Sequence, residues 1–367
     1  MMNLNGNNKL IRFVNKIRLL KAYEVYKRQS LRYLKSLRIP NKKMPGEKEY
    51  IEKWSFLSSK IDRVSYRLYS HYCGCIPDIV PEGIGRIIIE EALNPPRYRD
   101  FYNDKSLYPV IIGVTKVPQT LLCRINGSVI MDDSFTPIKT DVAGACRDIN
   151  RIILKPSIDS TSGKGIELFE FDHGRYVNGK GDILTKEYLL NYSNNFVLQK
   201  VIQQHPDLAL FNESSLNSIR IATYRSVKDE RPHVLSAILR IGKKGSAVDN
   251  AHAGGRYVGI NIVNGKLGDY VCDQYGKKST NWNGIDFSNS PYFIPEWDKV
   301  IAFAESITRK IYHHRLLALD LTVDKDGTPM LIEYNIGGFS YWLFEFTNQK
   351  PLGEYTDEII DFCKYHK

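Results

Sequence analysis

The sequence predicts an α+β fold in which a helical N-terminal region precedes a body of mostly antiparallel strands. Up to about residue 100, apolar side chains recur at helical spacing between prolines, whereas from Tyr108 onward short apolar runs of β type follow one another. A single strong helical pattern, over residues 297–311, interrupts these runs. Strands and helices therefore do not alternate as they do in a parallel βαβ array.

The composition is that of a folded protein with a sizeable core. The chain has 367 residues, of which 43% are hydrophobic and 25% are charged. These values exclude a disordered, collagen-like or disulfide-framework protein, and the length predicts two or three domains or lobes. No apolar run reaches the roughly 18 residues that a membrane-spanning helix needs.

Residues 1–45 form a basic leader. They hold seven Lys and five Arg against one acid, Glu24, while the rest of the chain holds 39 bases and 40 acids. Such a near-neutral body is not typical of a protein that binds nucleic acid over its main surface. Apolar residues recur between the bases at helical spacing, which predicts one or two basic amphipathic helices. These apolar positions are Leu10, Phe13, Val14, Ile17, Leu31, Leu34 and Leu37.

Two interpretations of the leader stay open. The helices either dock on an anionic membrane, where each base near the surface adds on the order of 1 kcal/mol, or pack on the protein's own body. Lys and Arg interrupt every apolar stretch that resembles a secretory signal, so we expect a cytoplasmic protein.

The six cysteines agree with that compartment. Only Cys73 and Cys75 are close in sequence, and they lack the spacing and the histidine partners of a zinc site. We therefore expect free, reduced thiols.

Nine β-type runs follow residue 108, bounded by turn-forming residues. They cover residues 109–114, 120–125, 152–155, 196–202, 219–226, 233–241, 257–262, 316–323 and 330–335.

The last two runs predict a hairpin, because a short Asp/Gly turn joins them. A turn centred on residues 325 and 326 puts Asp320 opposite Leu331. Alternation of faces then brings Asp320, Glu333 and Asn335 to one side of the sheet. Oxygen ligands of this kind suit Mg²⁺, whereas the alternative is a solvated polar stripe on the sheet surface.

The run over residues 152–155 delivers Lys155, and a loop rich in Ser, Thr and Gly follows it up to Gly165. Such a loop can fold backbone N–H groups over phosphates while the lysine binds one of them. It is not a Walker A loop, because Ile158 stands where that motif has Gly and no Ser or Thr follows Lys164. A plain hairpin turn is the alternative.

Two further runs carry candidate ligand-binding groups. The run over residues 196–202 leads into amide side chains and can offer a nucleotide base an apolar slot, or it is simply a core strand. The run that follows Ser215 begins with Asn217 and Arg220. An arginine there can bind a phosphoryl group or form a structural salt bridge.

The order of these parts resembles the ATP-grasp superfamily, and the chain is most similar to its sugar-transfer-associated family. The resemblance covers about residues 100–350. Its glycine loop has fewer glycines than many members, and Ser218 stands where the family often shows Thr. The anchors that carry the resemblance are Asp104-Lys105, Lys155-Pro156, Gln204-His205-Pro206, Ser215-Leu216-Asn217 with Arg220, Asp249-Asn250, Gly254-Gly255 and Glu333-x-Asn335.

The resemblance implies an ATP site between two α+β lobes, residues 104–203 and 204–367, which follow the leader and a helical region over residues 46–103. Lys105 and Lys155 would bind the α- and β-phosphates, and Arg220 with Lys155 would act on the transferred phosphoryl group. The loop that would close over the phosphates contains Ser162, Gly163, Lys164 and Gly165.

The resemblance also implies the remaining contacts of ATP, Mg²⁺ and the second substrate. Gln199, Lys200 and Ile202 would hold adenine, as in tubulin-tyrosine ligase-like relatives. Asp320, Glu333 and Asn335 would hold Mg²⁺. The residues that would line the substrate pocket are Asn217, Asp249, Asn250, His252 and Arg256, although a Gly-rich turn between strands explains the last four equally well.

The activity that the resemblance implies is ATP-dependent carboxylate–amine ligation through an acyl phosphate, with release of ADP and phosphate. The family name implies a sugar, nucleotide sugar or sugar-linked molecule as one substrate, in cell-surface polysaccharide biosynthesis. The leader would then keep the enzyme near the inner membrane face. The alternatives are an ATP-grasp kinase and a nucleotide-binding scaffold without turnover.

Overall fold

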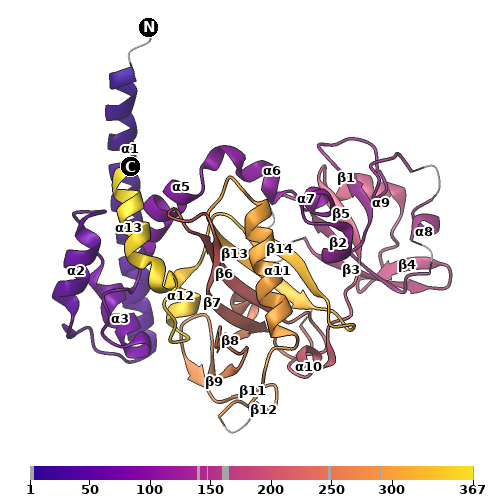
Figure 1. Cartoon of the computed structure of the whole chain (residues 1–367). Helices are drawn as coiled ribbons and strands as arrows, with labels where there is room; N and C mark the ends of the chain where they lie inside the picture. Colours follow the sequence, from indigo (N-terminus) through magenta and orange to yellow (C-terminus); the bar gives the residue numbers. More distant parts are fainter. Residues whose placement is uncertain are drawn as a thin grey trace.

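The computed structural model describes residues 4–138, 141–146, 148–158, 165–246, 249–288 and 291–366, with side chains from residue 14 onward except at position 15. In Figure 1 the helical N-terminal region lies on the left, the larger sheet lobe in the middle and the small sheet lobe on the right. The strands pair antiparallel throughout the described sheets, which confirms the α+β prediction.

The helical region starts with one long helix, α1 (Leu4–Ser36), whose N-terminal part projects beyond the body (Figure 1). Its C-terminal part packs on α3 and α4, where Tyr33 and Leu34 are buried. The other helical elements are α2 (Glu47–Ser55), α3 (Arg63–Cys73), α4 (Glu82–Ile84), the π-helical turn η1 (Gly85–Ile89) and α5 (Glu90–Leu93).

The packed face of α1 differs from the predicted apolar face. Val14, Ile17 and Leu31 are 45%, 39% and 38% exposed, whereas Leu34 is 2% exposed. The helix packs on the body through Ser30, Tyr33 and Leu34, so the predicted apolar positions divide between the packed and the exposed face of α1.

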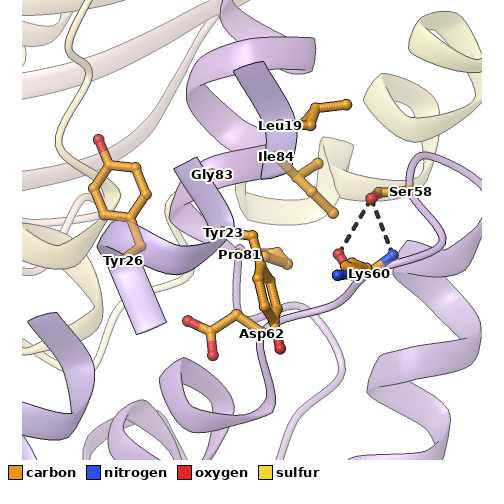
Figure 2. A pocket seen from close by; sticks show the side chains of 9 residues that line it. All are labelled: Leu19, Tyr23, Tyr26, Ser58, Lys60, Asp62, Pro81, Gly83 and Ile84. Atoms are coloured by element: carbon orange, nitrogen blue, oxygen red, sulfur yellow. Dashed lines mark hydrogen bonds between the residues drawn. The ribbon is translucent and has the colours of Figure 1, made fainter. Parts of the chain in front are cut away.

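Figure 2 shows a small hollow beside α1, lined among others by Tyr23 and Tyr26 of that helix and by Ile84 of α4. Ser58 and Lys60 close one side of it through hydrogen bonds between the Ser58 hydroxyl and the Lys60 backbone. The hollow lies within the helical region and away from both sheets. Its lining comprises Leu19, Tyr23, Tyr26, Ser58, Lys60, Asp62, Pro81, Gly83 and Ile84.

A run of short helical turns leads from this region to the small lobe: η2 (Pro96–Tyr98), α6 (Arg99–Asn103), η3 (Lys105–Leu107), α7 (Tyr108–Ile111) and η4 (Val114–Lys116). The strand predicted over residues 109–114 is therefore wrong. Pro109 lies in the first turn of α7, where its fixed φ suits a helix, and the ring of Tyr108 stacks on Tyr334 of the large lobe. Only Ile112 of this apolar stretch is buried, whereas Val110 and Val114 are exposed.

The small lobe contains, in its described part, a sheet of order β1-β5-β2-β3-β4. Two helices cover one face of this sheet, and Phe169, Phe196 and Leu198 fill the core between them. The elements are β1 (Thr120–Arg124), α8 (Val142–Ala145), β2 (Arg151–Pro156), β3 (Glu167–Asp172), β4 (Arg175–Asn178), α9 (Lys186–Tyr192) and β5 (Phe196–Lys200).

The large lobe contains, in its described part, a sheet of order β10-β9-β8-β7-β6-β13-β14. Its strands confirm the runs predicted from residue 219 onward. They are β6 (Ser218–Arg225), β7 (Pro232–Ile241), β8 (Arg256–Ile260), β9 (Leu267–Cys272), β10 (Lys278–Ser279), β13 (Leu316–Val323) and β14 (Pro329–Asn335), with the separate hairpin β11 (Asn281–Trp282) and β12 (Ile285–Asp286).

The helices of the large lobe determine which face of its sheet stays open. Helix α11 (Trp297–Lys310), predicted from its period, covers one face together with Leu317, Leu319 and Leu321 of β13. The opposite face packs, at one end, on the N-terminal helices and on α12 and α13. The remaining helical elements are α10 (Pro206–Ala209), η5 (Ala251–Ala253), α12 (Tyr341–Glu345), η6 (Gly353–Tyr355) and α13 (Thr356–Tyr365).

Candidate active site

The β13–β14 hairpin brings the three predicted metal ligands to one face of the large sheet. Asp320 lies directly opposite Glu333, and Ala318 lies opposite Asn335. The Asn335 amide Nδ2 donates to the Ala318 carbonyl and lies 3.4 Å from Asp320 Oδ2. This arrangement confirms that the three side chains lie on one face of the sheet.

The predicted register of this hairpin is wrong, because a β-bulge shifts the pairing of its strands. Asp320 does not face Leu331, because the pairing shifts between Asp320 and Leu321, which itself faces Leu331. The turn is also longer, since Asp324 accepts hydrogen bonds from the backbone N–H groups of Asp326 and Thr328. The extra residue in the bulge compensates for the longer turn, so the faces agree although the pairs do not.

Two arginines hold Asp320 in a buried ion-pair network. Arg220 binds it bidentately, Nε to Oδ1 at 2.8 Å and Nη2 to Oδ2 at 2.9 Å, and Arg240 Nη2 lies 3.3 Å from Oδ2. Burial would raise the pKa of Asp320, but Arg220 and Arg240 outweigh it and hold the pKa below its ordinary value. Asp320 therefore stays ionised although its side chain is almost fully buried.

Arg240 is the residue that the sequence analysis missed. It lies on β7 opposite Ser218 and donates to the Ser218 hydroxyl, while its Nη2 lies 3.4 Å from Asp249. Alternation of side chains along β7 gives the face on which Arg240 lies, and this is a signal that the sequence contains. Without the strand order, nothing in the sequence placed β7 beside Arg220.

The small lobe and the segment that precedes it supply two lysines to the same place. Lys105 Nζ lies 2.9 Å from Glu333 Oε1, and its backbone N–H donates to the Ser157 carbonyl of the small lobe. Burial and the nearby ammonium of Lys105 lower the pKa of Lys155 to about 8, against the attraction of Glu333. Both predicted phosphate-binding lysines thus lie beside a predicted metal ligand.

The predicted adenine strand β5 carries a buried amide that lacks one partner. The Gln199 Nε2 donates to the Thr120 hydroxyl and the Pro118 carbonyl, while Gln199 Oε1 has no hydrogen-bond partner among the described residues. A buried carbonyl without a partner is costly unless a donor reaches it. Lys200 and Ile202 lie at the exit of β5, where residues 201–204 cross to the large lobe.

The predicted phosphate loop is only partly described. Ser162, Gly163 and Lys164 lie outside the described residues. Gly165, at the end of the loop, has a φ of +78°, and its carbonyl accepts a hydrogen bond from the Tyr192 hydroxyl.

The predicted substrate residues separate into three places. Asp249 joins the site, because it accepts hydrogen bonds from the Ser218 backbone and hydroxyl. Asn250 caps the turn η5, and His252 Nδ1 contacts Gln274.

The other two are not brought to the site. Asn217 is fully buried, and its Nδ2 ties the carbonyls of Leu208 and Asn212. Arg256 lies opposite Ile241 of the α11-facing core, and its guanidinium stacks over the Trp282 ring at 4.6 Å. Strand alternation therefore directs Arg256 away from Asp320.

The chain that leaves β14 is held by a buried glutamate of the helical region. Glu90 accepts hydrogen bonds from the backbone N–H groups of Gly338 and Phe339. Burial raises the pKa of Glu90 to about 7, although these N–H groups and Arg86 favour the charged form; Glu82 raises it further. The folded protein therefore keeps a proton on Glu90 at pH values where the unfolded chain loses it.

This difference predicts that Glu90 destabilises the fold as the pH rises. Its contribution is most favourable below the ordinary pKa of 4.5 and declines until the pH passes about 7. In the unchanged protein the titration of Glu90 should lower the unfolding free energy by about 2 kcal/mol between about pH 5 and about pH 7.5. Glu90→Gln cannot titrate, so its unfolding free energy should lack this decrease. Urea unfolding at both pH values measures it.

The matched control for this pH dependence is Glu91→Gln. Glu91 is the next residue, but its side chain is 23% exposed and pairs with Arg18 on the surface. We expect this variant to keep the pH dependence of the unchanged protein. A Glu90→Gln variant with the same pH dependence as Glu91→Gln would contradict the buried, protonated state of Glu90.

The donor set on the open face fits Mg²⁺. Among the described residues no group of three or more His, Cys, Asp or Glu side chains comes together. The set is instead two carboxylates, Asp320 and Glu333, plus the amide oxygen of Asn335, which leaves coordination positions for phosphate oxygens and water. Cations already lie against both carboxylates, Lys105 against Glu333 and Arg220 against Asp320.

Comparison with known proteins places these features in a family. The model of a family described as sugar-transfer associated ATP-grasp matches residues 87–360, well over half of the chain. A comparison with curated protein sequences gives no match. No helix in the described part of the chain combines the length and the apolar character needed to cross a membrane.

Solved structures that resemble the chain are distant. An ATP-grasp ligase, PsnB, with Mg, ADP and a variant of its minimal precursor has 12% identity and a TM-score of 0.42, covering 74% of this chain and 61% of that one. D-cycloserine synthetase DcsG has 11% identity and a TM-score of 0.39, covering 74% and 73%. The D-alanine–D-alanine ligase of Bacillus anthracis with ATP has 11% and 0.39, covering 72% and 66%.

The chain thus spans about three fifths of the length of the PsnB structures. The family match, in contrast, extends from the helical region through both sheet lobes and includes every described residue of the lysine–carboxylate site. In the large sheet the arginine strand β6 lies directly beside the Asp–Glu–Asn hairpin β13–β14, whereas the lysine strand β2 belongs to the small sheet. The chain belongs to the sugar-transfer associated ATP-grasp family.

Proposed function

We propose that the protein is an ATP-dependent carboxylate–amine ligase that modifies a sugar or a sugar-linked molecule. The observation that carries this proposal is the meeting of cations from several elements, Lys105, Lys155, Arg220 and Arg240, around the paired carboxylates of Asp320 and Glu333. Such a site suits a molecule with several adjacent phosphates, because each phosphate finds a cation and the carboxylates hold the metal that accompanies it.

The chain's own residues would bind and orient ATP in the following way. Lys105 and Lys155 bind the α- and β-phosphates, the loop up to Gly165 covers them, and Gln199 Oε1 accepts a hydrogen bond from the adenine amino group. Asp320, Glu333 and Asn335 would hold Mg²⁺, which would supply positive charge to the phosphates.

Binding of ATP exchanges ion pairs that the protein makes with itself. Lys105 leaves Glu333 to bind a phosphate, and this frees the Glu333 carboxylate to bind the metal. Arg220 and Arg240 remain beside Asp320 and face the transferred phosphoryl group, where they stabilise the charge that develops.

The reaction has two steps, phosphoryl transfer to the carboxylate and attack of the amine on the acyl phosphate. A carboxylate oxygen of the donor attacks the γ-phosphorus, the bond to the β-phosphate oxygen breaks, and ADP leaves with that electron pair. An amine then attacks the carbonyl carbon of the acyl phosphate, the carbon–oxygen bond breaks, and phosphate leaves while the amine loses a proton to solvent. Closure of the two lobes keeps water from the acyl phosphate between these steps.

We further propose that the turn around Asp249, Asn250 and His252 borders the acceptor. Asp249 is tied to Ser218 and Arg240, so this turn is positioned by the phosphoryl-binding arginines. The assignment of a sugar and of polysaccharide biosynthesis rests on the family description alone.

The test is ³¹P NMR of the purified protein with Mg-ATP, a pool of amino acids and a pool of uronic-acid nucleotide sugars. A ligase releases inorganic phosphate only when both pools are present, and splitting the pools then names donor and acceptor. A new phosphoester signal would make the protein a kinase, the second candidate. Unchanged ATP under every combination would favour a scaffold without turnover and contradict the proposal.

We also propose that α1 holds the enzyme on an anionic membrane surface. Its outward face joins exposed apolar side chains to bases, and the exposed ring of Tyr275 borders the same face. The opposite face of α1 packs on the body, so one helix can both pack on the protein and dock on a membrane. The outward residues are Val14, Ile17, Lys21, Val25, Arg28, Leu31, Arg32 and Lys35.

Charge reversal on this face tests membrane docking without removing the part of α1 that fills the core. We expect the triple variant Lys21→Glu, Arg28→Glu, Lys35→Glu to lose about 100-fold or more of its partitioning onto vesicles with anionic lipid, since each base contributes about 1 kcal/mol. Sedimentation with vesicles of phosphatidylglycerol and phosphatidylcholine measures it.

The matched control reverses three exposed bases of the two sheet lobes, Lys180→Glu, Lys244→Glu and Lys266→Glu. It changes the net charge equally and should sediment like the unchanged protein. If both triple variants lost vesicle binding equally, the loss would come from the change in net charge, and docking through α1 would be refuted.

A further inference from the structure

A hollow lies between helix α1 and the turn over residues 273–277, which joins β9 to β10. Its volume is about 550 Å³, and binding pockets for small molecules typically measure about 300 to 1,000 Å³. It shares no residue with the small hollow of Figure 2 or with the lysine–carboxylate site. Its lining comprises Val25, Arg28, Gln29, Arg32, Tyr33 and Ser36 of α1 and Tyr275 of the turn.

Contacts within the protein hold both sides of this hollow in place. The backbone N–H groups of Tyr275 and Lys277 donate to Asp273 Oδ1, at 2.8 and 2.9 Å, and fix the turn. The Tyr275 ring meets the Tyr33 ring edge to face, with 5.7 Å between the ring centroids. Tyr33 is buried, and its hydroxyl accepts a hydrogen bond from Gln29 Nε2 at 2.6 Å. The hollow is therefore shaped before any ligand enters it.

The charge of the hollow is positive. Arg28 and Arg32 lie one helical turn apart, both are exposed, and neither forms an ion pair in the described part of the chain. Arg18 of the same helix, in contrast, pairs with Glu91. Among the residues that the structure describes, no acid belongs to the lining. Two guanidinium groups without a carboxylate partner suit a phosphate, whose oxygens accept hydrogen bonds from both.

The same hollow presents apolar surface. The side chains of Val25 and Tyr275 are both exposed, and Val25 continues a row of exposed aliphatic side chains along α1 to which Val14 and Ile17 belong. Inorganic phosphate gains nothing from these side chains, whereas a phospholipid carries glycerol and acyl carbons directly beside its phosphate. The combination therefore favours an anion that has an apolar part.

We infer that this hollow binds the headgroup of an anionic phospholipid. Arg28 and Arg32 donate to the phosphate oxygens, and the glycerol and first acyl carbons lie against Val25 and the Tyr275 ring. The inference deepens the proposed docking of α1 on an anionic membrane and rests on it for the source of the phosphate. It adds that one lipid per chain occupies a defined site, whereas docking through charge alone needs no such site.

The experiment measures lipid binding without a membrane. Isothermal titration calorimetry follows the full-length protein with dihexanoyl phosphatidylglycerol, kept below the concentration at which it forms micelles, and separately with inorganic phosphate. We expect saturable binding of one lipid per chain. Inorganic phosphate should bind at least about 10-fold more weakly, because it buries no apolar surface.

Two variants probe the hollow itself. Arg32→Gln removes one exposed guanidinium, and we expect it to weaken lipid binding by about 10- to 100-fold, the range for losing hydrogen bonds to a charged group. Tyr275→Ala removes the aromatic wall without changing the net charge and should also weaken lipid binding.

Lys21→Gln is the matched control. It removes one positive charge from an exposed position of the same helix, about 10 Å along the axis from Arg28 and outside the hollow. We expect it to bind the soluble lipid as tightly as the unchanged protein does. Urea unfolding checks that all three variants keep the fold.

The outcomes separate this inference from the proposed function. The inference would be overturned by absence of saturable binding of the soluble lipid, by equal losses in Arg32→Gln and Lys21→Gln, or by equally tight binding of inorganic phosphate. Each of these results would stand even if the protein still sediments with anionic vesicles. Saturable lipid binding by a protein that does not sediment with vesicles would contradict docking through α1 and support the lipid site. The titration contains no ATP, so its result does not depend on the proposed ligase activity.

Discussion

Asp320→Ala is expected to lose about 3 to 5 kcal/mol of unfolding free energy, because it leaves buried arginine charge without its partner. Asp320 is 2% exposed and Arg220, its bidentate partner, is 7% exposed. Arg240 would keep Asp249, but Arg220 has no second carboxylate among its described ion pairs. Urea unfolding at neutral pH measures the loss.

Two controls separate the buried pair from a general sensitivity of the hairpin. Asp326→Ala removes an exposed carboxylate at the hairpin tip and should cost less than about 0.5 kcal/mol. The double variant Asp320→Leu, Arg220→Met replaces both charges with apolar groups and should recover most of the loss. A loss in Asp320→Ala no larger than that in Asp326→Ala would refute the buried network.

The sequence was sufficient for elements whose pattern is local. The amphipathic period of α11 and the alternation in β6, β7 and β13 follow from residues close in the chain, and each is found within a few positions of its predicted limits. The stretch over residues 109–114 was not predictable in this way. Tyr108, which precedes it, stacks on Tyr334, more than 200 residues away, and Pro109 lies in the first turn of a short helix.

The same distinction applies to the site. Asp320, Glu333 and Asn335 could be placed on one face because two strands in a hairpin share a register, and a compensating bulge left that face unchanged. Arg240 could not be placed, since only the order of β6 and β7 in the sheet brings it to Asp320.

Arg256 and Asn217 show the converse limit of motif spacing. Both stand in stretches with the family's sequence, yet strand direction turns Arg256 toward Trp282, and backbone carbonyls occupy the amide of Asn217. A motif fixes which residue types lie near a site, but the face of a strand and the unmet hydrogen bonds of the backbone decide which of them reach it.

Glu333→Gln is expected to reduce Mg²⁺-dependent ATP turnover by about 10²- to 10³-fold while the fold survives. The Glu333 side chain is 32% exposed, and the amide oxygen of Gln can still accept a hydrogen bond from the buried Lys105, so the fold should survive. Turnover is measured as ADP release with the substrate pools that support phosphate release by the unchanged protein.

The change in nucleotide affinity of this variant, measured with and without Mg²⁺, shows whether Glu333 binds the metal or only holds Lys105. In this variant the ion pair between Lys105 and Glu333 no longer has to be broken, so metal-free AMP-PNP should bind at least as tightly as to the unchanged protein, whereas the gain in affinity on adding Mg²⁺ should shrink. Glu305→Gln, on α11 beneath the other face of the sheet, should change neither quantity. If Glu333→Gln kept the full Mg²⁺ effect and turnover within about threefold, the carboxylate would serve only to hold Lys105, and Mg²⁺ would need other ligands.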